Sequence, residues 1–124
     1  MTPAKQITVL LAEDHAIVRQ GLCALLNSDG AFKIVGEART GREAVEMARS
    51  LRPEVILMDI AMPVLNGLEA TRQILTADPA ARVVIRSAHS DDAYIERMTA
   101  AGVAGFLEKQ TSAEVLTKAI REVA

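Results

Sequence analysis

The sequence predicts an α/β domain in which a single parallel sheet of five strands is flanked by five helices on both faces. Short aliphatic runs alternate with segments of helical periodicity along the 124 residues, and this alternation is typical of parallel strands joined by right-handed crossovers. Half of the residues are hydrophobic, but only two Phe and one Tyr are aromatic. We therefore expect one doubly wound domain with an aliphatic core, because the chain is too short for two cores.

The strands are predicted from aliphatic runs, of which the third is the clearest. It reads "VILMD" and is continuously apolar up to Asp59, as expected for a strand that is buried on both faces. Its carboxylate is the first group that can meet solvent at the edge of the sheet. In chain order, the predicted strands cover residues 7–12, 32–38, 55–59, 82–87 and 103–109.

The helices are predicted from periodicity and from capping residues. Apolar residues at helical spacing predict the first helix over 15–27 and the last over about 115–123. We expect Gly30 and Gly102 to end the first and fourth helices in the left-handed conformation. At three places a capping side chain stands three residues before a Glu, which predicts a helix start. These pairs are Thr40 with Glu43, Asn66 with Glu69, and Thr111 with Glu114.

Charge and cysteine content narrow the classes of function. The chain has 14 Lys and Arg residues against 16 Asp and Glu, without the basic stripe that nucleic-acid binding requires. Its single cysteine, Cys23, cannot form a disulfide within the chain, and no run is apolar enough for a signal peptide or a membrane span. We expect a reducing, cytoplasmic setting and no binding of DNA or membrane by this domain itself.

Polar side chains follow four of the five predicted strands. Glu13 and Asp14 follow the first, Asp59 ends the third, Ser87 ends the fourth and Lys109 ends the fifth. The carboxyl ends of parallel strands form the binding edge of such a sheet. Crowded carboxylates repel one another unless a cation lies between them, and oxygen ligands without Cys or clustered His favour Mg²⁺ or Mn²⁺. A phosphoryl group is the expected ligand, since a hydroxyl and an ammonium group would bind its oxygens.

Each of these residues also has an ordinary structural interpretation. Asp59 is explained by a turn and Asp14 by a helix cap. Ser87 is explained as a loop hydroxyl and Lys109 as a solvated side chain. Complementary chemistry at four strand ends is much harder to attribute to turns, so the combination favours a functional site.

Four stretches together resemble the receiver domain of bacterial two-component response regulators, and the resemblance covers essentially residues 1–124. They read "LLAEDH", "ILMDIAMPVLNG", "IRSAHS" and "GFLEKQTSAEVL". The resemblance implies a flavodoxin-like sheet with strand order 2-1-3-4-5. It also implies a phosphoacceptor regulatory domain, with self-phosphorylation and autodephosphorylation chemistry, and not an enzyme.

The resemblance implies a role for each matching residue. Asp59 is expected to accept a phosphoryl group from a sensor histidine kinase. Asp14 is expected to bind Mg²⁺ directly, Glu13 through water and Ala61 through its backbone carbonyl, with Asp59 completing the protein ligands.

The remaining matches concern the phosphorylated state. Ser87 and Lys109 are expected to bind the phosphoryl group, and Ser87 with Phe106 to switch the surface that controls dimerisation and output. Ala61 and His89 occupy the positions where receivers tune hydrolysis of the acyl phosphate.

Further matches point to the branch with a LuxR-type helix-turn-helix domain. They are "EDH", Lys109 followed by Gln110, and "TSAEVLTKAI". We expect a C-terminal DNA-binding domain in the full-length protein, beyond residues 1–124, with a stand-alone receiver as the alternative. The expected partners are a sensor histidine kinase, a second copy on activation, and DNA through that absent domain.

Arg86 and Glu108 depart from the family, which prefers apolar side chains at both positions. A buried unpaired guanidinium is costly, and the fourth and fifth strands should be neighbours. We therefore predict that Arg86 and Glu108 form an ion pair. The alternative is that Arg86 reaches the phosphoryl group.

Three other functions remain as alternatives. An aspartyl-phosphate phosphatase would need a second acid two residues after Asp59, where Ala61 stands. A nucleotide-binding module would need a glycine-rich phosphate loop, and neither GxGxxG nor GxxxxGK[ST] occurs. A phosphorylation-independent interaction module would have no reason to keep three repelling carboxylates.

Overall fold

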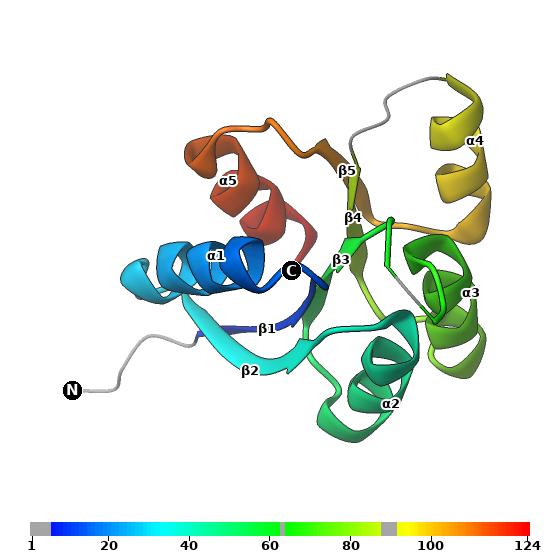
Figure 1. Ribbon diagram of the computed structural model, residues 1–124, viewed down its shortest axis with the longest axis horizontal. Helices are drawn as coiled ribbons and strands as arrows, with labels where there is room; N and C mark the ends of the chain where they lie inside the picture. Colours follow the sequence, from blue (N-terminus) through cyan, green and yellow to red (C-terminus); the bar gives the residue numbers. More distant parts are fainter. Residues whose placement is uncertain (1–5, 63, 88–91) are drawn as a thin grey trace.

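The computed structural model describes residues 6–62, 64–87 and 92–124 of the chain. Strands and helices alternate strictly along these residues (Figure 1). The elements are β1 (Ile7–Ala12), α1 (Ala16–Ser28), β2 (Phe32–Ala38), α2 (Gly41–Leu51), β3 (Val55–Asp59), α3 (Gly67–Ala77), β4 (Val83–Ser87), α4 (Asp92–Ala101), β5 (Gly105–Glu108) and α5 (Ala113–Val123).

The strands form one parallel sheet in the order β2-β1-β3-β4-β5, which confirms the predicted topology. Helices α1 and α5 cover one face, and α2, α3 and α4 cover the other (Figure 1). The strand order reverses between β1 and β3, so the crevice beyond their carboxyl ends is the expected place for a site. None of the described helices combines the length and the apolar character that a membrane crossing requires.

Strand β3 lies at the centre of the sheet, and all five of its residues are buried. Ile56 and Met58 pack into the core beneath α2, α3 and α4, whereas Val55 and Leu57 pack beneath α1 and α5. Successive side chains of a strand point to opposite faces, so both faces need apolar residues. This explains why the run before Asp59 is continuous and confirms the predicted two-sided burial.

The first three strands have the predicted bounds, whereas the last two are shorter than predicted. β4 begins at Val83 and β5 covers only Gly105–Glu108. Backbone hydrogen bonds continue the pairing just beyond β5, from Ala104 N–H to the Val83 carbonyl and from Lys109 N–H to the Ser87 carbonyl. The sequence pattern therefore extends over flanking residues that still form sheet hydrogen bonds, and it overestimates the length of the strands.

Two of the three predicted capping pairs are confirmed. The Thr40 side chain accepts a hydrogen bond from Glu43 N–H at the start of α2, and Asn66 accepts one from Glu69 N–H at the start of α3. The prediction for Thr111 is wrong, because the N-cap of α5 is its neighbour. That cap is Ser112, whose side chain accepts a hydrogen bond from Val115 N–H.

One of the two predicted helix ends is confirmed. Gly102 has a φ of 93° and follows α4 in the left-handed conformation, as predicted. The prediction for Gly30 is wrong, because it does not adopt a positive φ. At the end of α1 the Asp29 side chain instead accepts a hydrogen bond from Ala31 N–H, which shapes the turn without a left-handed glycine.

Candidate functional site

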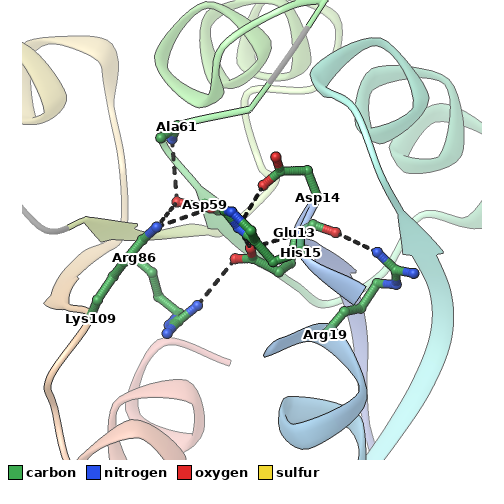
Figure 2. A network of polar contacts seen from close by, with 8 residues as sticks. All are labelled: Glu13, Asp14, His15, Arg19, Asp59, Ala61, Arg86 and Lys109. Atoms are coloured by element: carbon green, nitrogen blue, oxygen red, sulfur yellow. Dashed lines mark hydrogen bonds and ion pairs between the residues drawn. The ribbon is translucent and has the colours of Figure 1, made fainter. Parts of the chain in front are cut away.

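The carboxyl ends of four strands bring the predicted polar residues to one edge of the sheet (Figure 2). Carboxylate oxygens of Glu13, Asp14 and Asp59 lie within 4.8 Å of one another and of a ring nitrogen of His15. The acidic residues meet because β1 and β3 are neighbours in the sheet. The predicted acidic cluster is therefore assembled, and His15 is an addition to it.

Asp59 is held between an amine and a backbone amide. Its side chain is fully buried, and Lys109 Nζ lies 3.1 Å from Oδ1 and 3.2 Å from Oδ2. Ala61 N–H donates a hydrogen bond of 3.2 Å to Oδ1 (Figure 2). A single ammonium group therefore spans both oxygens of the most enclosed carboxylate in the cluster.

Both carboxylate oxygens of Glu13 have partners. His15 Nδ1 lies 2.9 Å from Oε1, and an Arg86 nitrogen lies 3.4 Å from Oε2. Burial and the neighbouring Asp59 carboxylate raise the pKa of Glu13, which the hydrogen bond with His15 partly opposes. Arg19 fixes the backbone here, because its guanidinium donates a 2.9 Å hydrogen bond to the Glu13 carbonyl.

Asp14 is the least compensated member of the cluster. Its Oδ1 is buried and accepts no hydrogen bond in the described part of the chain. His15 Nδ1 lies 3.2 Å from that oxygen, which is an ion-pair distance, but the directional contact of this ring nitrogen goes to Glu13. A buried carboxylate oxygen without a donor is the position that a bound cation would satisfy.

His15 and Arg19 were not among the predicted site residues. His15 is the exposed N-cap of α1, and its hydrogen bond with Glu13 and its proximity to Asp14 raise its pKa. Arg19 lies on the buried side of α1 and also pairs with Glu37 at 3.3 Å. Its placement among apolar positions of a helix face was the signal that could have identified it.

The predicted ion pair between Arg86 and Glu108 is wrong. The register aligns Arg86 with Leu107, and Ser87 with Glu108. Arg86 and Glu108 thus point to opposite faces of the sheet, since side chains alternate along a strand. Arg86 turns to Glu13 instead, and Glu108 is exposed.

Ser87 and Phe106 lie on the neighbouring strands β4 and β5. Ser87 is fully buried at the end of β4. Phe106 is half-buried, aligns with Ile85 and packs against the core beneath α2, α3 and α4. Their predicted roles in phosphoryl binding and switching stay predictions, and His89 lies outside the described residues.

The donor set fits a hard divalent cation. Three carboxylates converge at the edge of the sheet, and one of their buried oxygens lacks a donor. Mg²⁺ prefers oxygen ligands and is usually bound by one or two carboxylates together with a phosphate oxygen and water. Asp14 and Asp59 match this requirement. Lys109 carries a positive charge, which favours the binding of an anionic phosphate group beside them.

Comparisons with known proteins show the family of the chain. The family model described as the response regulator receiver domain matches residues 9–121. Response regulator GacA of Pseudomonas aeruginosa is 38% identical over 94% of this chain and 55% of its own length. Transcriptional regulatory protein DegU of Brevibacillus brevis is 35% identical over 96% of this chain and 50% of its own. The chain thus spans about half the length of these curated relatives.

Solved structures show the same fold. The signal receiver domain of NarL from Mycobacterium tuberculosis superposes with a TM-score of 0.92 at 29% identity, covering 96% of both chains. A LuxR-family two-component response regulator from Aurantimonas gives a TM-score of 0.91 at 32% identity, covering 96% of this chain and 85% of that one. With its acidic cluster at the carboxyl edge of the sheet, the chain belongs to the response regulator receiver domains, which are regulatory phosphoacceptors and not catalytic enzymes.

Proposed function

We propose that Asp59 is the phosphoacceptor and that it takes its phosphoryl group from a phosphohistidine of a sensor histidine kinase. The contact of Lys109 with both oxygens of buried Asp59, beside two further carboxylates, carries this proposal. In the transfer, an Asp59 oxygen forms a bond to phosphorus while the phosphorus–nitrogen bond breaks. The electron pair of that bond returns to the kinase imidazole. The rigid, buried strand β3 supports in-line attack by holding the carboxylate in place.

The cation of this site is Mg²⁺, with Mn²⁺ as a substitute that accepts the same oxygen ligands. Asp14 and Asp59 would hold it directly, the Ala61 carbonyl would be the third protein ligand, and Glu13 would act through water. The cation supplies positive charge that allows phosphoryl oxygens to approach the carboxylates. Two observations support this assignment: the Asp14 oxygen that accepts no hydrogen bond, and the proximity of Ala61 to Asp59.

The phosphorylated state is proposed to use Ser87 and Lys109 as ligands of the phosphoryl oxygens. Phosphorylation adds negative charge and strong acceptors, so the Ser87 hydroxyl would turn toward them and Phe106 would change its packing. The surface of α4, β5 and α5 would change in response and favour a homodimer. Ala61 and His89 are proposed to tune hydrolysis of the acyl phosphate.

The full-length protein is proposed to regulate transcription in the cytoplasm through a C-terminal DNA-binding domain. Relatives of about twice this length, among them one named a transcriptional regulatory protein, support this proposal. The kinase partner and the homodimer would then couple a signal to DNA binding by that domain.

Intact-mass measurement after incubation with acetyl phosphate and Mg²⁺ tests the central step. We expect one phosphoryl group per wild-type chain, none on Asp59→Asn, and a chelator to prevent uptake. Asp78→Asn is the matched control, because Asp78 lies at the far end of α3, and it should behave like the wild type. Uptake that survives Asp59→Asn would remove Asp59 from its role. Multiple turnover on a small phosphate ester would indicate a phosphatase instead.

A further inference from the structure

Arg86 reaches past a neighbouring strand to contact Glu13. The register pairs Ala12 with Met58 and Asp59 with Arg86, so residues 13, 59 and 86 form one row across β1, β3 and β4. Neighbouring strands lie about 4.8 Å apart, and two such spacings separate β4 from β1. Only a long side chain can bridge them, and the guanidinium ends 3.4 Å from Glu13 Oε2 (Figure 2).

The contact is buried, and a guanidinium is costly there unless it is paired. The Arg86 side chain is 11% exposed and that of Glu13 only 1%. A buried charge requires a paired partner, and Glu13 is the acidic side chain that the structure pairs with Arg86. Glu13 is therefore compensated by the protein itself, with Arg86 at one oxygen and His15 at the other.

The three carboxylates of the site consequently differ in what compensates them. Asp59 is paired with Lys109 and Glu13 with Arg86, whereas a buried oxygen of Asp14 accepts no hydrogen bond and lies only at ion-pair distance, 3.2 Å, from the exposed His15. A cation entering the site would meet an available Asp14 and an Asp59 that it shares with Lys109. It would find Glu13 already engaged.

We propose that Arg86 is a positioning residue that lowers the affinity of this site for divalent cations by pairing with the Glu13 carboxylate, so that Glu13 reaches a cation only through water. The inference rests on the proposed function, because it concerns the Mg²⁺ that Asp59 would use. Cation affinity at carboxylate sites depends on the number of charged ligands available. Arg86 removes one carboxylate from that number and adds a positive charge beside it. Full occupancy of the site would thus require a higher Mg²⁺ concentration, which ties phosphoryl uptake to the level of the free cation.

Mg²⁺ titration calorimetry on purified variants at pH 8 tests this inference. Arg86→Met keeps an unbranched apolar stem and removes the charge. We expect it to bind Mg²⁺ on the order of tenfold more tightly than the wild type, as two charges interacting across the site would give. Arg86→Lys keeps the charge and should bind within about twofold of the wild type. Arg86→Gln is a second neutral variant, and the thermal transition of each variant confirms that it folds.

A double-mutant cycle shows whether the effect passes through Glu13. In a Glu13→Gln background, Arg86→Met should change Mg²⁺ affinity by less than about threefold, because no carboxylate is released. Equal affinities of the wild type and both neutral variants would overturn the inference and leave the proposed function intact. An undiminished effect in the Glu13→Gln background would overturn it as well. A wild type that neither binds Mg²⁺ nor takes up phosphate would overturn the proposed function, and this inference with it.

Discussion

Lys109 Nζ lies 3.1 Å from Asp59 Oδ1 although the two residues are 50 positions apart in the sequence. The amine compensates one buried carboxylate, but two more carboxylates lie within 4.8 Å of it. Like charges at this separation oppose one another strongly when they are buried. The site is thus expected to lower the stability of the domain until a cation is bound.

The first prediction is that Asp59→Asn stabilises the metal-free domain. The substitution removes the central charge of the cluster, and Lys109, whose side chain is 29% exposed, can be hydrated once it is released. We expect the free energy of unfolding in urea with a chelator to increase by about 1 kcal/mol. Asp78→Asn should change it by less than about 0.5 kcal/mol. A loss of stability in Asp59→Asn would mean that the ion pair with Lys109 outweighs the repulsion.

The second prediction concerns His15 and pH. Its neighbours Glu13 and Asp14 raise its pKa in the folded state, so folding favours the protonated imidazole. The resulting stabilisation is fully present below the unfolded pKa of about 6.5, and is lost as pH rises through the higher folded pKa. The melting temperature of the wild type should therefore exceed that of His15→Gln more at pH 6 than at pH 8.5. Thermal denaturation at low ionic strength measures this difference, and a pH-independent difference would contradict the assignment.

The parallel α/β architecture could be predicted because it depends on one-dimensional patterns, whereas the strand order was implied by the resemblance to receiver domains. The continuous apolar run ending at Asp59 identifies a central strand, and the alternation of strands and helices leaves few ways to arrange them. The edge on which the polar strand ends meet follows from parallel pairing alone. The acidic cluster and its contact with Lys109 could thus be expected before any coordinates.

The contacts of the long cationic side chains could not be predicted in this way. The pairing proposed for Arg86 assumed that adjacent strands bring adjacent positions together. Register sets which residues face one another, and a shift of one residue places Glu108 on the opposite face. Arg19 and Arg86 reach several ångströms from their own backbone, so their partners depend on three-dimensional packing. The cap of α5 lies one residue after the predicted Thr111, because a capping pattern locates a helix start only to within a residue or two.

The third prediction is that Cys23 is a poorly reactive thiol. Burial, with a smaller contribution from nearby Glu37, raises its pKa to about 11. At pH 8 about one thiol in a thousand would be ionised, against roughly a quarter for an ordinary cysteine with a pKa near 8.5. Alkylation by iodoacetamide should be more than about a hundredfold slower in the native protein than in urea. Equal rates in both conditions would show that Cys23 is accessible and normally acidic.

The last prediction tests how tightly Asp59, the proposed phosphoacceptor, is positioned, by comparing two glycines. A Cβ on Gly67, the first residue of α3, would lie 2.3 Å from the Asp59 carbonyl oxygen and 2.7 Å from the Cα of Ile60. These are backbone atoms, which cannot move without moving the end of β3. We expect Gly67→Ala to destabilise the domain by about 2 to 4 kcal/mol and to slow phosphoryl uptake from acetyl phosphate.

Gly21 is the matched control for this substitution. It lies inside α1, and a Cβ there would meet no atom within 4 Å apart from its own helix backbone and chain neighbours. Alanine has the higher helix propensity, so Gly21→Ala should stabilise the domain by about 1 kcal/mol and leave phosphoryl uptake unchanged. Urea denaturation and intact-mass time courses on the two variants measure both effects. If Gly67→Ala is as stable and as readily phosphorylated as the wild type, the close contact between α3 and the end of β3 does not position Asp59.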